Sequence, residues 1–206
     1  SAALEQGFTL ASLINDAPIN QWDKSSGVVW RPKNSPETYV GPIRMRLALA
    51  QSKNVIAVRL LKSIGLDQAI GHLSLFGFAP DELPRNESLA LGSASLTPLE
   101  VVTGFATFAN GGYLIDPYLI ERIETAEGDI VFQANPALAC DPCEADNDMA
   151  DENGLLDDDE SSIALLNDSK PSPPIISAPR ASSAQNAFLS TEALNSAVWG
   201  ADWSAE

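Results

Sequence analysis

The stretch Gln51-Ser52-Lys53-Asn54 places a hydroxyl, an amine and two amides together inside an otherwise apolar segment, residues 47–65. Two interpretations fit such a polar break. In the first, Ser52 caps the helix that follows, and its hydroxyl accepts a backbone N–H. In the second, Ser52 and Asn54 form an S-x-N motif that faces a cleft, while the buried helix at 55–64 holds them in place. The pattern by itself favours the cap, because S-x-N triplets are common by chance.

The segments around this break are predicted to be mainly helical. Helices are expected at about 43–50, 53–64 and 66–76, and Gly65 and Gly77 are suited to end the second and the third. Residues 1–14 resemble the end of a helix that stops near Asn15-Asp16-Ala17-Pro18. Residues 15–42 are rich in Pro, Gly, Ser and Asn, which predicts a long loop.

The second half of the chain carries clearer local signals. Thr97-Pro98-Leu99-Glu100 has the pattern of a capping box, so a helix should run from there to Asn110-Gly111-Gly112. Residues 118–133 alternate apolar and polar on either side of Glu127-Gly128, which predicts a hairpin, and a last helix is expected at 184–199. This order of elements predicts an α+β fold with segregated helices. One face of the helix after Thr97 carries Leu99, Val102, Phe105, Ala106 and Ala109.

The net charge of −16 is concentrated in one tract. Eleven acidic residues and no Lys or Arg lie between Asp141 and Asp168, and the remainder carries 17 acidic against 12 basic residues. No basic stripe is present to neutralise phosphates, so we expect no nucleic-acid partner. Residues 144–183 are acidic and then rich in Pro and Ser, which predicts a disordered insertion between residues 1–143 and a returning segment at 184–206.

Three features resemble metal or redox sites but have simpler explanations. Cys140 and Cys143 are expected to form a local disulfide or to be free thiols, because a zinc site needs more ligands than this chain offers nearby. Residues 149–160 approach a calcium loop, but Met149 stands where the first Asp belongs, so we expect no metal and no cofactor. His72 has no nucleophile near it in sequence and is interpreted as structural.

Several motifs together resemble a known family. They are Trp30-x-Pro32-x-Asn34, the run IRMRLALAQSKN, the block ESLALGSASLTPLEVVTGFATFANGG at 87–112, and the hairpin after Asp116-Pro117. These are similar to the transpeptidase domain of class A, bifunctional penicillin-binding proteins. The resemblance implies the α+β penicillin-binding transpeptidase fold, which is β-lactamase-like, and this chain would supply mainly its helical subdomain and a hairpin.

The same resemblance implies roles for individual residues. Ser52 and Asn54 match S-x-N, with Ser52 relaying a proton and Asn54 binding the substrate's acyl side chain; Trp30 is a further candidate for substrate contact. Lys53, between them, is expected to be less constrained. This chain contains no S-x-x-K and no K-T-G. We therefore expect both motifs to lie outside it, upstream of Ser1 and downstream of Glu206, and the chain by itself to be inactive.

The longer protein is expected, by resemblance, to act at the periplasmic face of the bacterial inner membrane. Its partners would be peptidoglycan stem peptides and a lipid-linked precursor, with β-lactams as inhibitors and a membrane anchor outside this chain. In an oxidising periplasm, Cys140 and Cys143 can be bridged. Two alternatives stay open: an acidic interaction or calcium-binding module on a helical scaffold, and a serine β-lactamase-like hydrolase.

Overall fold

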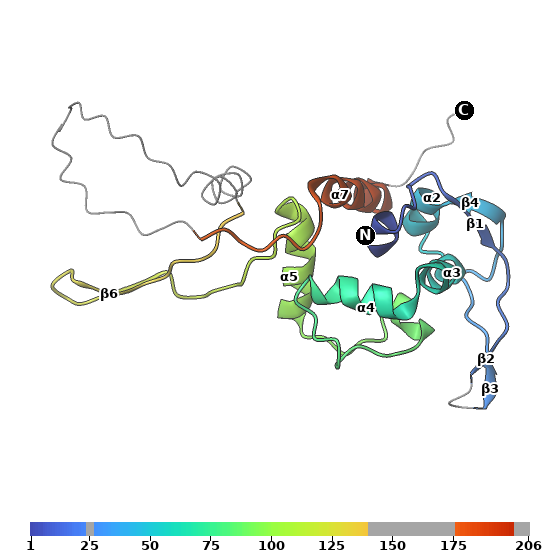
Figure 1. Cartoon of the computed structure of the whole chain (residues 1–206), viewed down its shortest axis with the longest axis horizontal. Helices are drawn as coiled ribbons and strands as arrows, with labels where there is room; N and C mark the ends of the chain where they lie inside the picture. Colours follow the sequence, from blue (N-terminus) through green and yellow to red (C-terminus); the bar gives the residue numbers. More distant parts are fainter. Residues whose placement is uncertain (24–26, 140–175, 200–206) are drawn as a thin grey trace, which may run out of the picture. The chain divides into compact units, whose positions relative to one another are not determined.

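The computed structural model describes residues 1–23, 27–139 and 176–199, which form two compact units. One unit contains residues 1–114 and 180–206, and the other contains residues 115–179. Figure 1 shows the helices of the first unit and the hairpin of the second. The mixture of helices and small antiparallel sheets confirms the predicted α+β class.

The first 44 residues contain more strand than the sequence indicates. Helix α1 (Ala2–Glu5) ends early, and Gly7 then adopts a φ of 84°. Strand β1 (Leu13–Asp16) pairs antiparallel with β4 (Gly41–Arg44), while β2 (Gln21–Asp23) pairs with β3 (Val28–Trp30). The predictions of a helix over 1–14, a loop over 15–42 and a helix from 43 are therefore wrong in part. These strands are only three or four residues long, which is too short for an alternating apolar and polar pattern to be recognised.

Helix α3 (Asn54–Ile64) contributes side chains to both hydrophobic clusters of this unit and follows α2 (Met45–Ala50). Its side chains Val55 and Val58 pack with Ile19, Trp30 and Tyr39, and a second cluster joins Ile56 to Ile43 and Ala48. The exposed residues of α3 include Lys62 and Ser63, so the predicted burial of this helix is confirmed. Buried apolar packing of this kind makes α3 a rigid support for the residues at its start.

Two helices and a short 3₁₀ segment follow. Gly65, with φ 89°, ends α3 as predicted and precedes α4 (Leu66–Ser74); η1 (Glu87–Leu91) comes next. Helix α5 (Pro98–Ala109) begins with the predicted capping box: the Thr97 hydroxyl accepts from the Glu100 N–H, and the Glu100 carboxylate accepts from the Thr97 N–H.

The apolar face of α5 is largely exposed. Leu99, Val102 and Phe105 are 59%, 64% and 56% exposed, and the buried positions are Gly104 and Thr107. A periodic apolar pattern indicates that one face of a helix is suited to burial. It does not indicate which segment covers that face. The apolar residues do share a face of α5, but most of that face is exposed in the described residues.

The chain returns to the first unit before the predicted boundary at residue 184. The Ala181 and Ser182 N–H groups donate to the Gly112 carbonyl, and Arg180 donates to the Gly111 carbonyl. Helix α7 (Ala184–Trp199) matches the predicted last helix and lies against α2 and α5 (Figure 1). No helix in the described ranges combines the length and the apolar character needed to cross a bilayer.

The second unit consists of a hairpin and a short return. Strands β5 (Arg122–Glu124) and β6 (Ile130–Gln133) pair antiparallel around a turn in which Gly128 has a φ of 93°, so the predicted hairpin is confirmed. Leu138 then exchanges backbone hydrogen bonds with Ile176 and Ala178. The candidate sites at Cys140, Cys143 and 149–160 lie outside the described residues. Of the predicted disordered insertion at 144–183, only residues 176–183 are described.

Candidate functional site

The polar break is a short connection between α2 and α3. The N–H groups of Gln51, Ser52 and Lys53 donate to carbonyls of α2, at Leu47, Leu49 and Ala48. Ser52 has a φ of 51°, the one positive φ of a non-glycine residue among those the structure describes. A side chain in the left-handed region costs about 1–2 kcal/mol. Strain of this kind persists only where neighbouring contacts fix the backbone, and such positions are common at functional sites.

Ser52 does not cap helix α3, so the simpler of the two sequence interpretations is wrong. The N-cap residue is Lys53, and its side chain makes no capping hydrogen bond. The side-chain oxygen of Asn34 instead accepts from the Val55 N–H at 3.1 Å. This frees the Ser52 hydroxyl, which has no hydrogen-bond partner in the part of the chain that the structure describes.

Lys53 is held far more tightly than the sequence interpretation supposed. Its ammonium lies 3.3 Å from a carboxylate oxygen of Asp16, and the two side chains are 10% and 0% exposed. The ammonium also donates to the Thr38 carbonyl at 3.4 Å. The expectation that Lys53 is less constrained than its neighbours does not hold for its side chain, which forms a buried ion pair.

Asn54 begins α3 and is partly buried. Its side-chain amide donates to the Lys33 carbonyl at 2.9 Å. A primary amide carries two N–H groups and an acceptor oxygen, so one donor and the oxygen stay available to a ligand. The predicted role of Asn54 in binding an acyl side chain stays a prediction.

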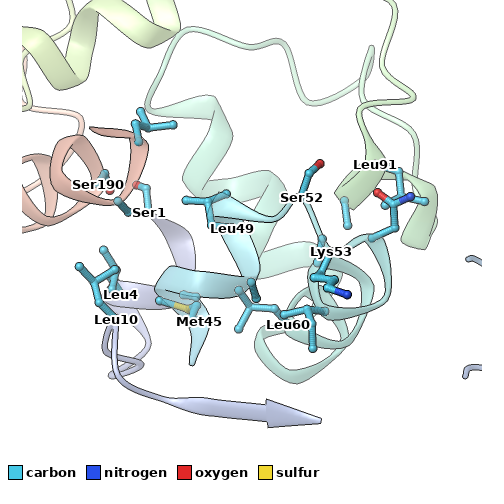
Figure 2. Close-up of a pocket in the computed structure, with 18 of the residues that line it drawn as sticks. Ser1, Leu4, Leu10, Met45, Leu49, Ser52, Lys53, Leu60, Leu91 and Ser190 are labelled. Carbon is cyan, nitrogen blue, oxygen red and sulfur yellow. The ribbon is translucent and has the colours of Figure 1, made fainter. Parts of the chain in front are cut away.

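A cavity of about 500 Å³ lies beside this loop, as Figure 2 shows. Ser52, Lys53 and Asn54 line it together, so the structure brings the motif to one wall of one cavity. Its volume falls in the usual range for small-molecule sites, and a few polar groups against apolar walls are typical of them. The apolar lining includes Leu49, Leu60, Leu91, Phe105 and Phe108, and the α1 end contributes Ser1, Ala3 and Leu4.

Trp30 and His72 lie apart from this wall. Trp30 packs against the core beside Val55 and Val58 and is not among the residues that line the cavity, so its predicted contact with substrate stays a prediction. The His72 ring lies 2.6 Å from the Ser1 hydroxyl and 5.1 Å, between ring centroids, from Phe76. Burial is the main cause that lowers the pKa of His72, so a neutral imidazole is favoured there.

Asp16 and Asn34 are the residues that sequence reasoning missed. Asp16 stands where the sequence predicted the end of a helix and the start of a long loop, and Asn34 was noted only as part of the Trp30-x-Pro32-x-Asn34 motif. A buried acid is expensive unless it is paired, but that burial becomes visible only after folding. No three metal-binding side chains of His, Cys, Asp or Glu gather anywhere in residues 1–23, 27–139 and 176–199.

The chain is similar to proteins of known family over most of its length. Residues 1–142 match the family model described as the penicillin binding protein transpeptidase domain. Penicillin-binding protein 1A of Vibrio cholerae is 49% identical over 100% of this chain and 23% of its own length. The Escherichia coli K12 protein of the same name is 42% identical over 97% of this chain and 26% of its own length.

Solved structures give the same assignment. The crystal structure of penicillin-binding protein 1A from Haemophilus influenzae aligns with a TM-score of 0.78 at 43% identity, covering 98% of this chain and 28% of that protein. Penicillin-binding protein A from M. tuberculosis, solved as an imipenem acyl-enzyme complex, aligns with a TM-score of 0.64 at 20% identity. The alignment covers 95% of this chain and 40% of that protein, and at this identity it supports the fold alone. The chain thus spans about a quarter of the length of the relatives named 1A.

Proposed function

Since this chain belongs to the penicillin-binding protein transpeptidase family, we propose that it forms one wall of the active site of a serine-type D-Ala-D-Ala transpeptidase that cross-links peptidoglycan. The observation that carries the proposal is the Ser52 hydroxyl. It is exposed, free of partners among the described residues, and displayed at the cavity by a left-handed backbone conformation. The left-handed conformation also ends helix α2, because the Ser52 and Lys53 N–H groups donate to the Leu49 and Ala48 carbonyls in the pattern of a Schellman motif. The proposal therefore depends on the exposed, unpartnered hydroxyl at the cavity.

The chemistry proposed is acyl transfer in two steps. A serine oxygen attacks the carbonyl of the penultimate D-Ala, the bond to the terminal D-Ala nitrogen breaks, and an ester to the enzyme forms. An amine of a neighbouring strand then attacks that ester and restores the serine. Ser52 would hydrogen-bond to the catalytic lysine and relay the proton that the departing amine needs.

Asn54 would orient the donor strand. Its side chain already donates one hydrogen bond to the Lys33 carbonyl, which fixes the plane of the amide. The remaining N–H would bind the carbonyl of the substrate's acyl side chain and hold the scissile bond near the nucleophile. Orientation of this kind lowers the barrier without any change in the reacting groups.

The attacking serine and its lysine would come from an S-x-x-K motif outside this chain, and K-T-G would come from another segment outside it. Ser1, Ala3 and Leu4 line the same cavity as Ser52, so chain preceding Ser1 would approach the Ser52 wall directly. We infer that the 206-residue chain alone is inactive and that the longer protein is a bifunctional glycosyltransferase and transpeptidase. Its site would face the periplasm, its substrates would be stem peptides and a lipid-linked precursor, and β-lactams would acylate it.

The test is acylation of the longer protein by a fluorescent penicillin. Ser52→Ala should slow acylation by about a hundredfold or more, the range for loss of a positioned acid–base group. Ser63→Ala is the matched control, because Ser63 is an exposed serine at the far end of α3 whose hydroxyl donates to the Arg59 carbonyl. Equal rates for wild type and Ser52→Ala would contradict the proposed role of Ser52.

Two further outcomes would favour the alternatives. Rapid turnover of a chromogenic β-lactam by the wild-type protein would indicate a β-lactamase-like hydrolase, because water rather than an amine would then discharge the ester. Loss of activity on deletion of residues 144–170, with Ser52→Ala active, would indicate an interaction module. Under the proposal the deletion leaves acylation nearly unchanged.

A further inference from the structure

Asp16 is a buried carboxylate at the end of β1 whose two oxygens serve three donors from different segments. One oxygen accepts from the Asn34 amide at 2.7 Å. The other accepts from the Val40 N–H at 3.3 Å and lies 3.3 Å from the Lys53 ammonium. The carboxylate is therefore well satisfied, which a charge removed from water requires.

Asn34 connects this carboxylate to the start of helix α3. Its amide nitrogen donates to Asp16 and to the Thr38 carbonyl, and its oxygen accepts from the Val55 N–H. Every hydrogen-bonding atom of this buried side chain is used. The neighbouring Lys33 carbonyl accepts from the Asn54 amide, so residues 33 and 34 contact two successive residues of α3.

These contacts fix the backbone on one side of Ser52. Lys53 points into the protein because Asp16 holds its ammonium, and Val55 is held through Asn34. On the other side, the Ser52 N–H donates to the Leu49 carbonyl of α2. Ser52 thus stands between two constrained segments, and Figure 2 shows its hydroxyl and the Lys53 ammonium extending from the loop in different directions.

We propose that Asp16, Asn34 and Lys53 are positioning residues that hold the S-x-N loop in its reactive geometry; the inference rests on the proposed function. A buried ion pair contributes little net stability compared with apolar residues of the same size, so stability alone does not explain its presence. Its effect here is directional. The ammonium lies 3.3 Å from Asp16, and this contact fixes the Lys53 side chain and thereby the backbone next to Ser52.

The test compares single and double substitutions in the longer protein. Lys53→Met removes the charge, keeps an unbranched chain, and leaves Asp16 buried without its cation. Lys53→Met/Asp16→Asn removes both charges together and keeps a side-chain oxygen that can accept from the Asn34 amide or the Val40 N–H, so its thermal midpoint should return toward the wild-type value. Arg85→Met is the matched control, because it breaks an ion pair with Asp67 in which both side chains are mainly exposed.

The decisive readout is the acylation rate constant at saturating fluorescent penicillin, measured beside the thermal midpoint. The double variant should be nearly as stable as wild type yet acylate roughly tenfold to a hundredfold more slowly, since a small misplacement of a catalytic group has effects of that size. Arg85→Met should change neither quantity. If Lys53→Met does not fold, the double variant still decides the question.

Two results separate this inference from the proposed function. If the double variant recovers both stability and the wild-type acylation rate while Ser52→Ala stays slow, the three residues are structural only and the inference fails alone. If wild-type protein is not acylated at all, the proposed function fails first. A slow double variant with wild-type stability supports the inference.

Discussion

The side-chain oxygen of Asn34 accepts a 3.1 Å hydrogen bond from the backbone N–H of Val55, in place of the capping serine that local sequence suggested. The first N–H groups of a helix have no partner within the helix and need one from elsewhere. Here the acceptor comes from a loop distant in sequence. The exchange leaves the Ser52 hydroxyl available at the cavity.

Replacing Asn34 should destabilise the protein strongly. Asn34→Ala leaves the Val55 N–H unsatisfied and removes one donor from the buried Asp16 carboxylate. Each unsatisfied buried group costs about 1–3 kcal/mol, so a total of about 3 kcal/mol is expected. Thermal denaturation of the longer protein measures it. Asn20→Ala, at an exposed asparagine, should leave the midpoint unchanged, and a similar midpoint for Asn34→Ala would contradict the capping role.

Ser52→Gly should be at least as stable as Ser52→Ala, and the two variants should be acylated equally slowly. Glycine adopts the φ of 51° without the penalty of about 1–2 kcal/mol that a β-carbon brings. Its greater freedom in the unfolded chain offsets about 0.5–1 kcal/mol of that gain. We expect Ser52→Gly to match or exceed Ser52→Ala in thermal midpoint, with both equally slow towards fluorescent penicillin. Faster acylation by the glycine variant would show that backbone strain, rather than the hydroxyl, limits the rate.

Gly112→Ala should disrupt the return of the chain to the first unit. A β-carbon on Gly112 would lie 2.1 Å from the Ser182 carbonyl oxygen, and its φ is +104°. Gly111→Ala is the control: its φ is +72°, but a β-carbon there meets no atom within 4 Å.

Both variants carry backbone strain at a positive φ, and only Gly112→Ala adds the collision with Ser182. We expect Gly112→Ala to be less stable than Gly111→Ala by about 1–3 kcal/mol, the usual cost of overpacking. Limited proteolysis should also cut more readily at residues 176–183 in the Gly112 variant. Equal stability and equal cleavage would show that residues 180–183 can shift without cost.

The capping box of α5 should make stability depend on pH in the acidic range. The hydrogen bond from the Thr97 hydroxyl, followed by the one from its backbone N–H, lowers the pKa of Glu100. Because the folded-state pKa lies below the unfolded value, this contribution is present above the unfolded pKa of about 4.5 and is lost as pH falls through the folded pKa.

The comparison is between wild type and Glu100→Gln, which keeps the shape of the side chain but does not titrate. Wild type should lose thermal stability more steeply between about pH 5 and pH 3. Above that range the two curves should run parallel. Identical slopes at low pH would mean that the capping carboxylate is not coupled to folding.

Features set by neighbours in sequence were predictable. The Thr97 capping box, the turn around Gly128, the glycine after α3 and helix α7 all depend on residues within a few positions of one another. Ser52 and Asn54 were recognisable as a motif because the S-x-N spacing itself carries the information. Local contacts form in the same way wherever the segment stands in the chain, so their signals can be read without the fold.

Features set by distant pairing were decided only by the tertiary structure. Asp16 is an ordinary acid and Lys53 an ordinary base in the sequence, and only the pairing of β1 with β4 brings the carboxylate behind the loop. The same is true of Asn34 as a helix cap and of the exposed face of α5. The burial of a side chain and the identity of its neighbours depend on segments that are distant in sequence. The residues next to it in the sequence carry no information about those segments. The sequence therefore determined which residues could do the chemistry, and the packing around α3 determined which way they point.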